Sequence, residues 1–213
     1  MTVEQKQEIK SQNDKIIAEK GYRVNSWLPI LEDPAPRSIE EIKGRVSVMT
    51  ALINIAFKAP THIIKNWIEK NDLTRHLSKS ESEILSKDNR KLNELEIESL
   101  LWYLESLWGL LWVLKMIDNL EAEIHVGDNL VTLVPNLQLN ENNDKIAQQQ
   151  HLQTELDIYI MLDYYYRLHW YCVNERLPGR QAKLNEGLIY ERRKALEWVF
   201  DKQSDWDNIE MST

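Results

Sequence analysis

The stretch at residues 91–117, KLNELEIESLLWYLESLWGLLWVLKMI, decides the fold. At 100° per residue, its mostly polar or small positions fall within one sector of roughly 120°. These positions are Glu98, Ser99, Trp102, Glu105, Ser106 and Gly109. Leu, Trp, Tyr and Val fill most of the remaining circumference. A helix with so wide an apolar surface lies inside a fold, so we expect helix 91–117 to be central.

A second long helix is expected at residues 145–175, beginning near Asp144 and ending before Pro178-Gly179. We expect it to pack against helix 91–117 at the centre. Shorter helices are predicted at 3–20, 38–57, from Thr61 onward and at 187–202. Capping boxes at Ser38–Glu41 and Ser80–Glu83 predict two of the starts. Residues 22–37 hold three prolines and read as extended, and 118–143 reads as irregular, with a short strand or a helical turn.

Composition supports one mainly α domain over residues 1–213, with little or no β-structure. Glycine and proline are scarce, at six each, which suits helices better than a turn-rich β-sandwich. A chain of this length buries roughly 70% of its unfolded surface, so it needs no disulfide or metal to stabilise it. The single cysteine, Cys172, excludes an internal disulfide and a cysteine-rich zinc site. It reads as a buried hydrophobe rather than a nucleophile.

The net charge of −8 is concentrated in the middle of the chain. Residues 116–163 hold nine acidic residues against one base, Lys145. Such a zone repels phosphate, which disfavours nucleic acid, and it would attract a basic protein. The candidate partner surface comprises Glu121, Glu123, Asp128, Glu141 and Asp144. The alternative is a solvated surface that aids solubility.

A cytoplasmic location is expected. The N-terminal segment is charged throughout, unlike a signal peptide. The longest apolar run, Leu107 to Leu114, is too short to cross a bilayer. We therefore expect no membrane partner.

The familiar enzyme motifs are absent. The chain has no G-x-G-x-x-G, G-x-x-x-x-G-K-[ST], G-x-S-x-G or H-E-x-x-H, and no Glu three positions before a His. No cofactor and no metal is therefore expected. Sites are also assembled from distant residues, so these absences do not exclude an enzyme.

Two groups of residues still suggest chemistry. The stretch YYYRLHWYC at 164–172 offers Arg167 and His169, and His169 would be a general base if exposed. Its structural interpretation is a packed helix in which His169 is a core residue while Asp163 and Arg167 face polar partners. The pair Glu98 and Glu105 would do acid–base work, form ion pairs or mark a solvated face. The i,i+4 pair Arg193–Glu197 reads as an ordinary surface pair.

Four segments, in order, resemble the domain of unknown function 4272 family over about residues 12–209. They contain R-S-x-E-E-I from Arg37, a Glu before L-L-W at Glu98, R-x-H-W from Arg167, and E-R-R-x-A-L-x-W from Glu191. The resemblance implies an α-rich bacterial domain and no assigned activity. The marked residues are Arg37, Ser38, Glu41, Arg45, Glu98, Trp102, Arg167, His169, Trp170, Arg192 and Trp198. The polar ones would line a single pocket if Arg37, Glu98 and His169 lie together.

Three functions fit these observations. The first is a non-enzymatic interaction module whose acidic zone binds a basic protein, as a bacterial immunity protein or antagonist would. The second is an enzyme using Glu98, Glu105, Arg167 and His169. The third is a small-ligand sensor with Trp102 and Trp170 as pocket walls and Arg37 and Arg45 as binding residues.

Overall fold

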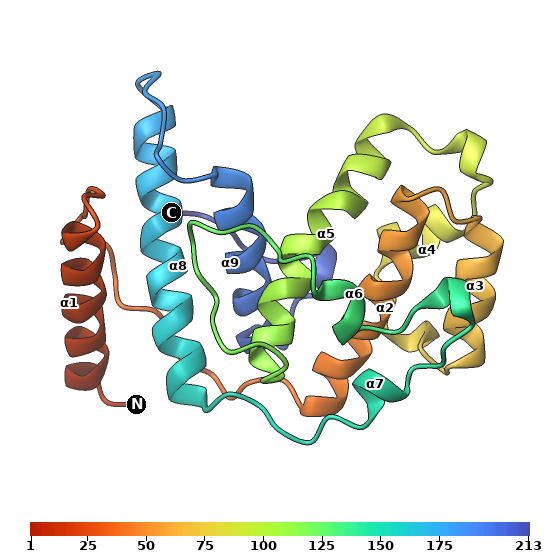
Figure 1. The fold of residues 1–213 in the computed structure, drawn as a ribbon. Helices are drawn as coiled ribbons and strands as arrows, with labels where there is room; N and C mark the ends of the chain where they lie inside the picture. The colour runs from red at the N-terminus through yellow and green to blue at the C-terminus, as the bar shows by residue number, and fades with distance from the viewer.

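The protein is a row of helices, seen here in a computed structural model that describes residues 1–213 (Figure 1). In spatial order α1 packs on α8, α8 on α9, α9 on α5, α5 on α2, α2 on α3 and α3 on α4. The helices are α1 (Val3–Glu19), α2 (Ile39–Ala56), α3 (Thr61–Lys70), α4 (Lys79–Leu85), α5 (Glu94–Val113), α6 (Leu130–Leu133), α7 (Asp144–Ala147), α8 (Glu155–Arg176) and α9 (Glu186–Phe200). No strand is present, which confirms the mainly α prediction.

Helix α5 lies in the middle of this row, between α9 and α2, as its wide apolar surface predicts. Asn93 begins it through a capping box with Glu96. The polar sector behaves differently from a solvated face. The sector is exposed near the N-terminus of the helix, at Glu98. Further along the helix, Glu105, Ser106 and Gly109 are buried against α9.

The expected direct packing of the two long helices is wrong. Helix α9 lies between α5 and α8 and packs along both (Figure 1). The second long helix also begins later than expected. Residues 144–147 form the separate short helix α7, and α8 starts only after Thr154, whose side chain caps it by accepting from the Asp157 amide. Local propensity did not reveal this break.

Smaller boundaries follow the local chemistry. Helix α1 ends before Gly21, whose φ of +78° suits glycine. The expected cap at Thr61 is wrong, because Pro60 is the N-cap and the Thr61 hydroxyl donates to the Lys87 carbonyl. The expected capping box at Ser80 is also wrong. Ser78 is the cap of α4 and pairs with Glu81.

Residues 114–154 form a strap across one face of the row (Figure 1). The strap contains α6, the 3₁₀ turn Leu137–Leu139 and α7. It is anchored at its end and in its interior: the Gln153 amide donates to the Val113 carbonyl, and the Trp67 indole donates to the Glu141 carbonyl. The region expected to be irregular is therefore an ordered covering layer with helical turns and no strand. None of the helices combines the length and the apolarity that crossing a bilayer requires.

Candidate functional site

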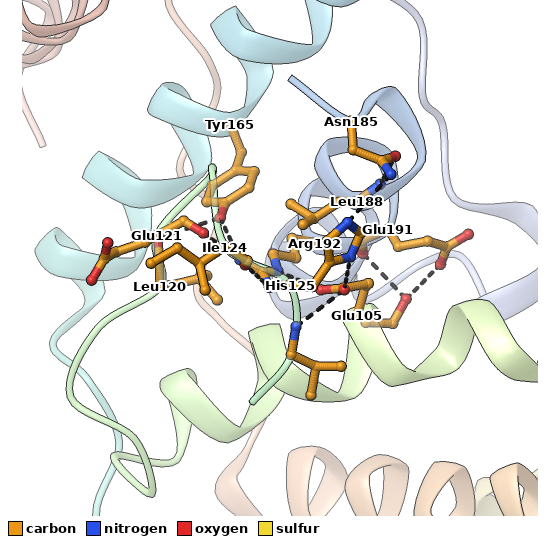
Figure 2. Close-up of polar contacts among 12 residues, drawn as sticks. Glu105, Leu120, Glu121, Ile124, His125, Tyr165, Asn185, Leu188, Glu191 and Arg192 are labelled. Carbon is orange, nitrogen blue, oxygen red and sulfur yellow. Dashed lines mark hydrogen bonds and ion pairs between the residues drawn. The ribbon is translucent and has the colours of Figure 1, made fainter. Parts of the chain in front are cut away.

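Arg192 is the hub of the central polar cluster, which joins α5, α8, α9 and the strap (Figure 2). Its side chain is fully buried, and all five guanidinium N–H groups have partners. Nε and Nη2 donate to Glu105 Oε2 at 2.9 and 2.6 Å. Nη1 donates to the Glu121 carbonyl and the Tyr165 hydroxyl, and Nη2 also reaches the Ile124 carbonyl. Arg192 therefore fastens the strap to the helices and has no donor left for a ligand.

Glu105 is equally occupied. Its Oε1 accepts from the Val126 amide at 3.2 Å and lies 2.8 Å from His125 Nδ1. Burial raises the pKa of Tyr165, which donates to the Leu120 carbonyl of the same strap segment. The cluster is a closed set of ion pairs and hydrogen bonds, and its geometry serves to position the strap.

A second cluster joins α1 to α8 around Arg167. Its guanidinium makes a bidentate pair with Asp163 at 2.7 and 2.8 Å, and Nη1 donates to Asp14 at 3.3 Å. Asn13 donates to Asp163 as well. Burial raises the pKa of Asp14 in spite of the nearby arginine. Asp163 and Arg167 face polar partners as expected, and these partners are each other and the residues of α1 in a buried cluster.

His169 lies in a third cluster, with Arg193. The histidine is buried, and its Nδ1 accepts from Arg193 Nη1 at 2.7 Å. Burial and the neighbouring guanidinium lower the pKa of His169 to about 4. Arg193 also pairs with Glu197 and donates to the carbonyls of Met211 and Ser212. His169 is thus a core histidine. The expected i,i+4 pair Arg193–Glu197 forms, but it is not an ordinary surface pair because Arg193 is buried.

Arg37 and Arg45 line the same hollow, of about 490 Å³, between the N-terminal half of α2, residues 75–78 and the C-terminal segment. We call it the Arg37 hollow. Arg37 stacks on Trp198 at 4.4 Å and donates to the carbonyls of Trp198, Asp201 and Ser204. Arg45 pairs with buried Glu81, which also accepts from the Tyr103 hydroxyl at 2.8 Å. Both arginines are therefore largely committed to structural contacts.

Glu98 and Trp102 line a second hollow, of about 670 Å³, between α4, α5, α9 and the segment around Trp206. We call it the Trp102 hollow. Trp102 is 39% exposed and lies directly over Gly187, where an added Cβ would be 2.3 Å from the indole. Sequence reasoning missed two groups of this hollow, Glu191 and Lys194. They stand one turn apart in the E-R-R-K stretch, and that spacing was the signal.

The predicted catalytic set is not assembled. No hydrogen bond or ion pair joins any two of Glu98, Glu105, Arg167 and His169, because each belongs to a different cluster or hollow. Trp170 is half-buried against the core and lines neither hollow. Arg37, Glu98 and His169 likewise share no pocket.

The acidic partner residues lie mostly at the surface of the strap. Glu121, Asp128 and Asp144 are exposed, form no ion pair and belong to neither hollow. The same is true of Asp118. Glu123 pairs with Lys20 at 2.7 Å, and Glu141 pairs with Lys145 at 2.8 Å. Part of the predicted surface is thus neutralised within the chain, and the other part is free.

An apolar hollow of about 410 Å³ opens beside the strap, between α2, α5 and α6. We call it the Phe57 hollow. Its rim carries Phe57, 63% exposed, and Val131, 71% exposed. Its floor includes Leu104, Leu107 and Leu130. Nowhere in the chain do three or more His, Cys, Asp or Glu side chains gather closely enough to hold a metal ion.

Comparison with known proteins gives a family and no function. No curated protein and no solved structure matches the chain. The family model described as a domain of unknown function, DUF4272, matches residues 9–209. That range holds all the clusters and hollows above except the terminal carbonyls that Arg193 binds, and it covers the four segments whose resemblance the sequence suggested. The chain belongs to the DUF4272 family.

Proposed function

We propose that this protein is a non-enzymatic binding module, which uses the strap and the Phe57 hollow to dock a basic, amphipathic segment of another protein. The observation that carries the proposal is the pairing of free carboxylates with exposed aliphatic side chains on one anchored segment. Asp118, Glu121, Asp128 and Asp144 are exposed without a cation partner. Ile124, Val131 and Leu139 of the same strap are 56%, 71% and 71% exposed.

The apolar and charged groups exposed on the strap support a binding role. Large exposed apolar side chains beside a hollow are typical of interaction sites. The free carboxylates would attract a basic partner over a distance of about one Debye length, roughly 8 Å at physiological salt. Arg192 and Glu105 hold the strap in place before the partner arrives, so little ordering entropy is lost on docking.

The side chains of the buried polar clusters already bond to one another, which favours a binding role for this protein over a catalytic one. Arg192, Arg167 and Arg193 donate their hydrogen bonds to other groups of the same chain. A cytoplasmic antagonist that covers a basic surface of its target, as an immunity protein covers a toxin, is the form of binding that we propose. The single buried thiol, Cys172, fits such a reducing compartment.

The test uses a Lys/Leu peptide that forms an amphipathic helix and a scrambled peptide of the same composition. Binding is measured by fluorescence anisotropy at several salt concentrations. We expect the amphipathic peptide to bind more tightly, and its affinity to fall steeply as salt is raised. Equal binding of the two peptides, or no binding, would refute the proposal.

Two variants separate charge from apolar contact. Neutralising Asp118, Glu121, Asp128 and Asp144 to their amides should weaken binding about tenfold or more at low salt. The matched control neutralises four exposed acids outside the strap, Glu8, Glu32, Asp72 and Glu94, and changes the net charge equally. Val131→Ser should weaken binding at every salt concentration. A control variant that loses as much affinity as the strap variant would show that only net charge matters.

A further inference from the structure

The Trp102 hollow contains an amine that the fold leaves unpaired. Lys194 projects from α9 into this hollow, and its Nζ lies 4.7 Å from the centre of the Trp206 ring. It forms no hydrogen bond and no ion pair with any residue of the chain. Surface lysines keep their ammonium group in water, but Lys194 is half-buried in a hollow that Trp102 and Trp206 also line.

The surroundings favour the neutral amine. Burial lowers the pKa of Lys194, and the Arg45 guanidinium, which stacks on the same Trp206 ring at 5.0 Å, acts in the same direction. Glu191, Asp207 and Glu81 oppose the shift through their charges, but burial is the largest cause. The contact with the face of the Trp206 ring likewise favours the charged ammonium. This contact does not replace the hydration that the ammonium loses on burial.

An acid stands beside this amine. Glu191 lies one turn earlier on α9 and lines the same hollow. Its Oε2 accepts a hydrogen bond from the Ser106 hydroxyl at 2.5 Å, which fixes the carboxyl group. Burial raises the pKa of Glu191 in spite of that bond and of the Lys194 charge. The hollow thus holds an amine and a carboxyl group whose environments both favour their neutral forms.

We infer that Lys194 forms a reversible imine with a neutral aromatic aldehyde that enters the Trp102 hollow. The amine lone pair adds to the carbonyl carbon and gives a carbinolamine. Glu191 in its acid form protonates the hydroxyl group, which leaves as water. As the C=N bond forms, the nitrogen gives its proton to the Glu191 carboxylate, which restores the acid. One water is released for each imine, and no oxidant or reductant is consumed.

The lining determines the class of carbonyl compound. Apart from Glu191 and Lys194, the hollow is lined by three carboxylates, Glu83, Glu98 and Asp207, and one ammonium group, that of Lys79. An anionic keto acid is therefore repelled. The exposed Trp102 ring offers a flat wall on which an aromatic ring stacks.

The test treats the full chain with benzaldehyde and sodium cyanoborohydride, which reduces any imine to a stable benzyl-lysine. Peptide mapping by mass spectrometry then locates the label. At pH 7 we expect Lys194 to be labelled faster than the exposed Lys183 and Lys202, because a lowered pKa leaves a larger fraction of its amine neutral. The advantage should narrow at pH 10, where all lysines lose protons. Glyoxylate should label Lys194 less than benzaldehyde does.

Two variants complete the test. Lys194→Arg keeps a cation over Trp206. In this variant only the fast labelling at position 194 should disappear. Glu191→Gln keeps an acceptor for Ser106 and should slow labelling of Lys194 without affecting Lys183. Labelling spread evenly over the lysines, or equal labelling in Glu191→Gln, would overturn the inference. The peptide-binding surface lies on other residues, so Lys194→Arg should bind the basic peptide as the native chain does, whatever the labelling result.

Discussion

Replacing Arg192 with methionine should destabilise the protein more than any other single arginine substitution of this kind, because Arg192 holds together four parts of the fold. Methionine keeps an unbranched apolar stem and removes the guanidinium. The change leaves Glu105 as a buried carboxylate without its cation, and it removes the donors to the carbonyls of Glu121 and Ile124.

The magnitude follows from these contacts. Breaking a buried ion pair by removing one partner costs about 3–5 kcal/mol. Glu105 keeps the Val126 amide and His125 as neighbours, which lowers the cost. The two carbonyls are only partly buried, so water replaces much of what they lose. We expect a loss of about 4 kcal/mol in the free energy of unfolding. A domain of ordinary stability, about 5–15 kcal/mol, stays folded after this loss.

Urea denaturation followed by circular dichroism measures the loss, and hydrogen exchange locates it. Amides of the strap at 120–126 should exchange faster in Arg192→Met, while those of α3 should not change. The matched control is Arg176→Met on α8, where the arginine side chain is 59% exposed and pairs with Glu186 at 3.0 Å. That exposed pair contributes about 0–1 kcal/mol.

The double variant Glu105→Leu, Arg192→Met isolates the buried charge. It removes both charges and should be less destabilised than Arg192→Met alone. A loss below about 1 kcal/mol in Arg192→Met, similar to that of the exposed control, would refute the argument that this cluster holds the strap.

Two further predictions rest on buried groups. His169 has its pKa lowered to about 4, so between about 4 and 6.5 the unfolded chain binds more protons and stability rises with pH. His169→Asn keeps an acceptor for Arg193 and should flatten this rise in urea titrations at a series of pH values; an unchanged slope would contradict it. Cys172 is fully buried and burial raises the pKa of its thiol to about 12, so Ellman's reagent at pH 8 should react only after guanidinium unfolds the chain. Rapid reaction of the folded protein would disprove that burial.

The sequence predicted the parts of the fold that depend on local pattern. The helical period of residues 91–117, the capping box at Ser38 and the glycine at position 21 each determine an element by themselves. It failed at Thr154, which caps α8 locally but follows a residue, Gln153, whose amide donates to the distant Val113 carbonyl. No window of residues contains that contact.

The prediction of the catalytic residues was wrong for a related physical reason. Periodicity assigns a polar sector to water, so Glu98 and Glu105 looked alike. Glu98 does lie in an open hollow, but Glu105 meets Arg192 from a helix that is 87 positions away in the chain. A hydropathy pattern measures how polar a face is, and it cannot tell a solvated face from one that is satisfied by another helix.

The arginines show what that distinction means for function. The sequence offered Arg167 as a candidate catalytic group and Arg192 as a residue of the family motif, and both are buried with carboxylates as partners. An arginine that spends its donors within the chain cannot bind a substrate without losing a structural contact. The groups free to act are those that the fold leaves unpaired: the carboxylates of the strap and the amine of Lys194. Function in this protein is therefore better sought among unpaired exposed or half-buried groups than among its most heavily bonded residues.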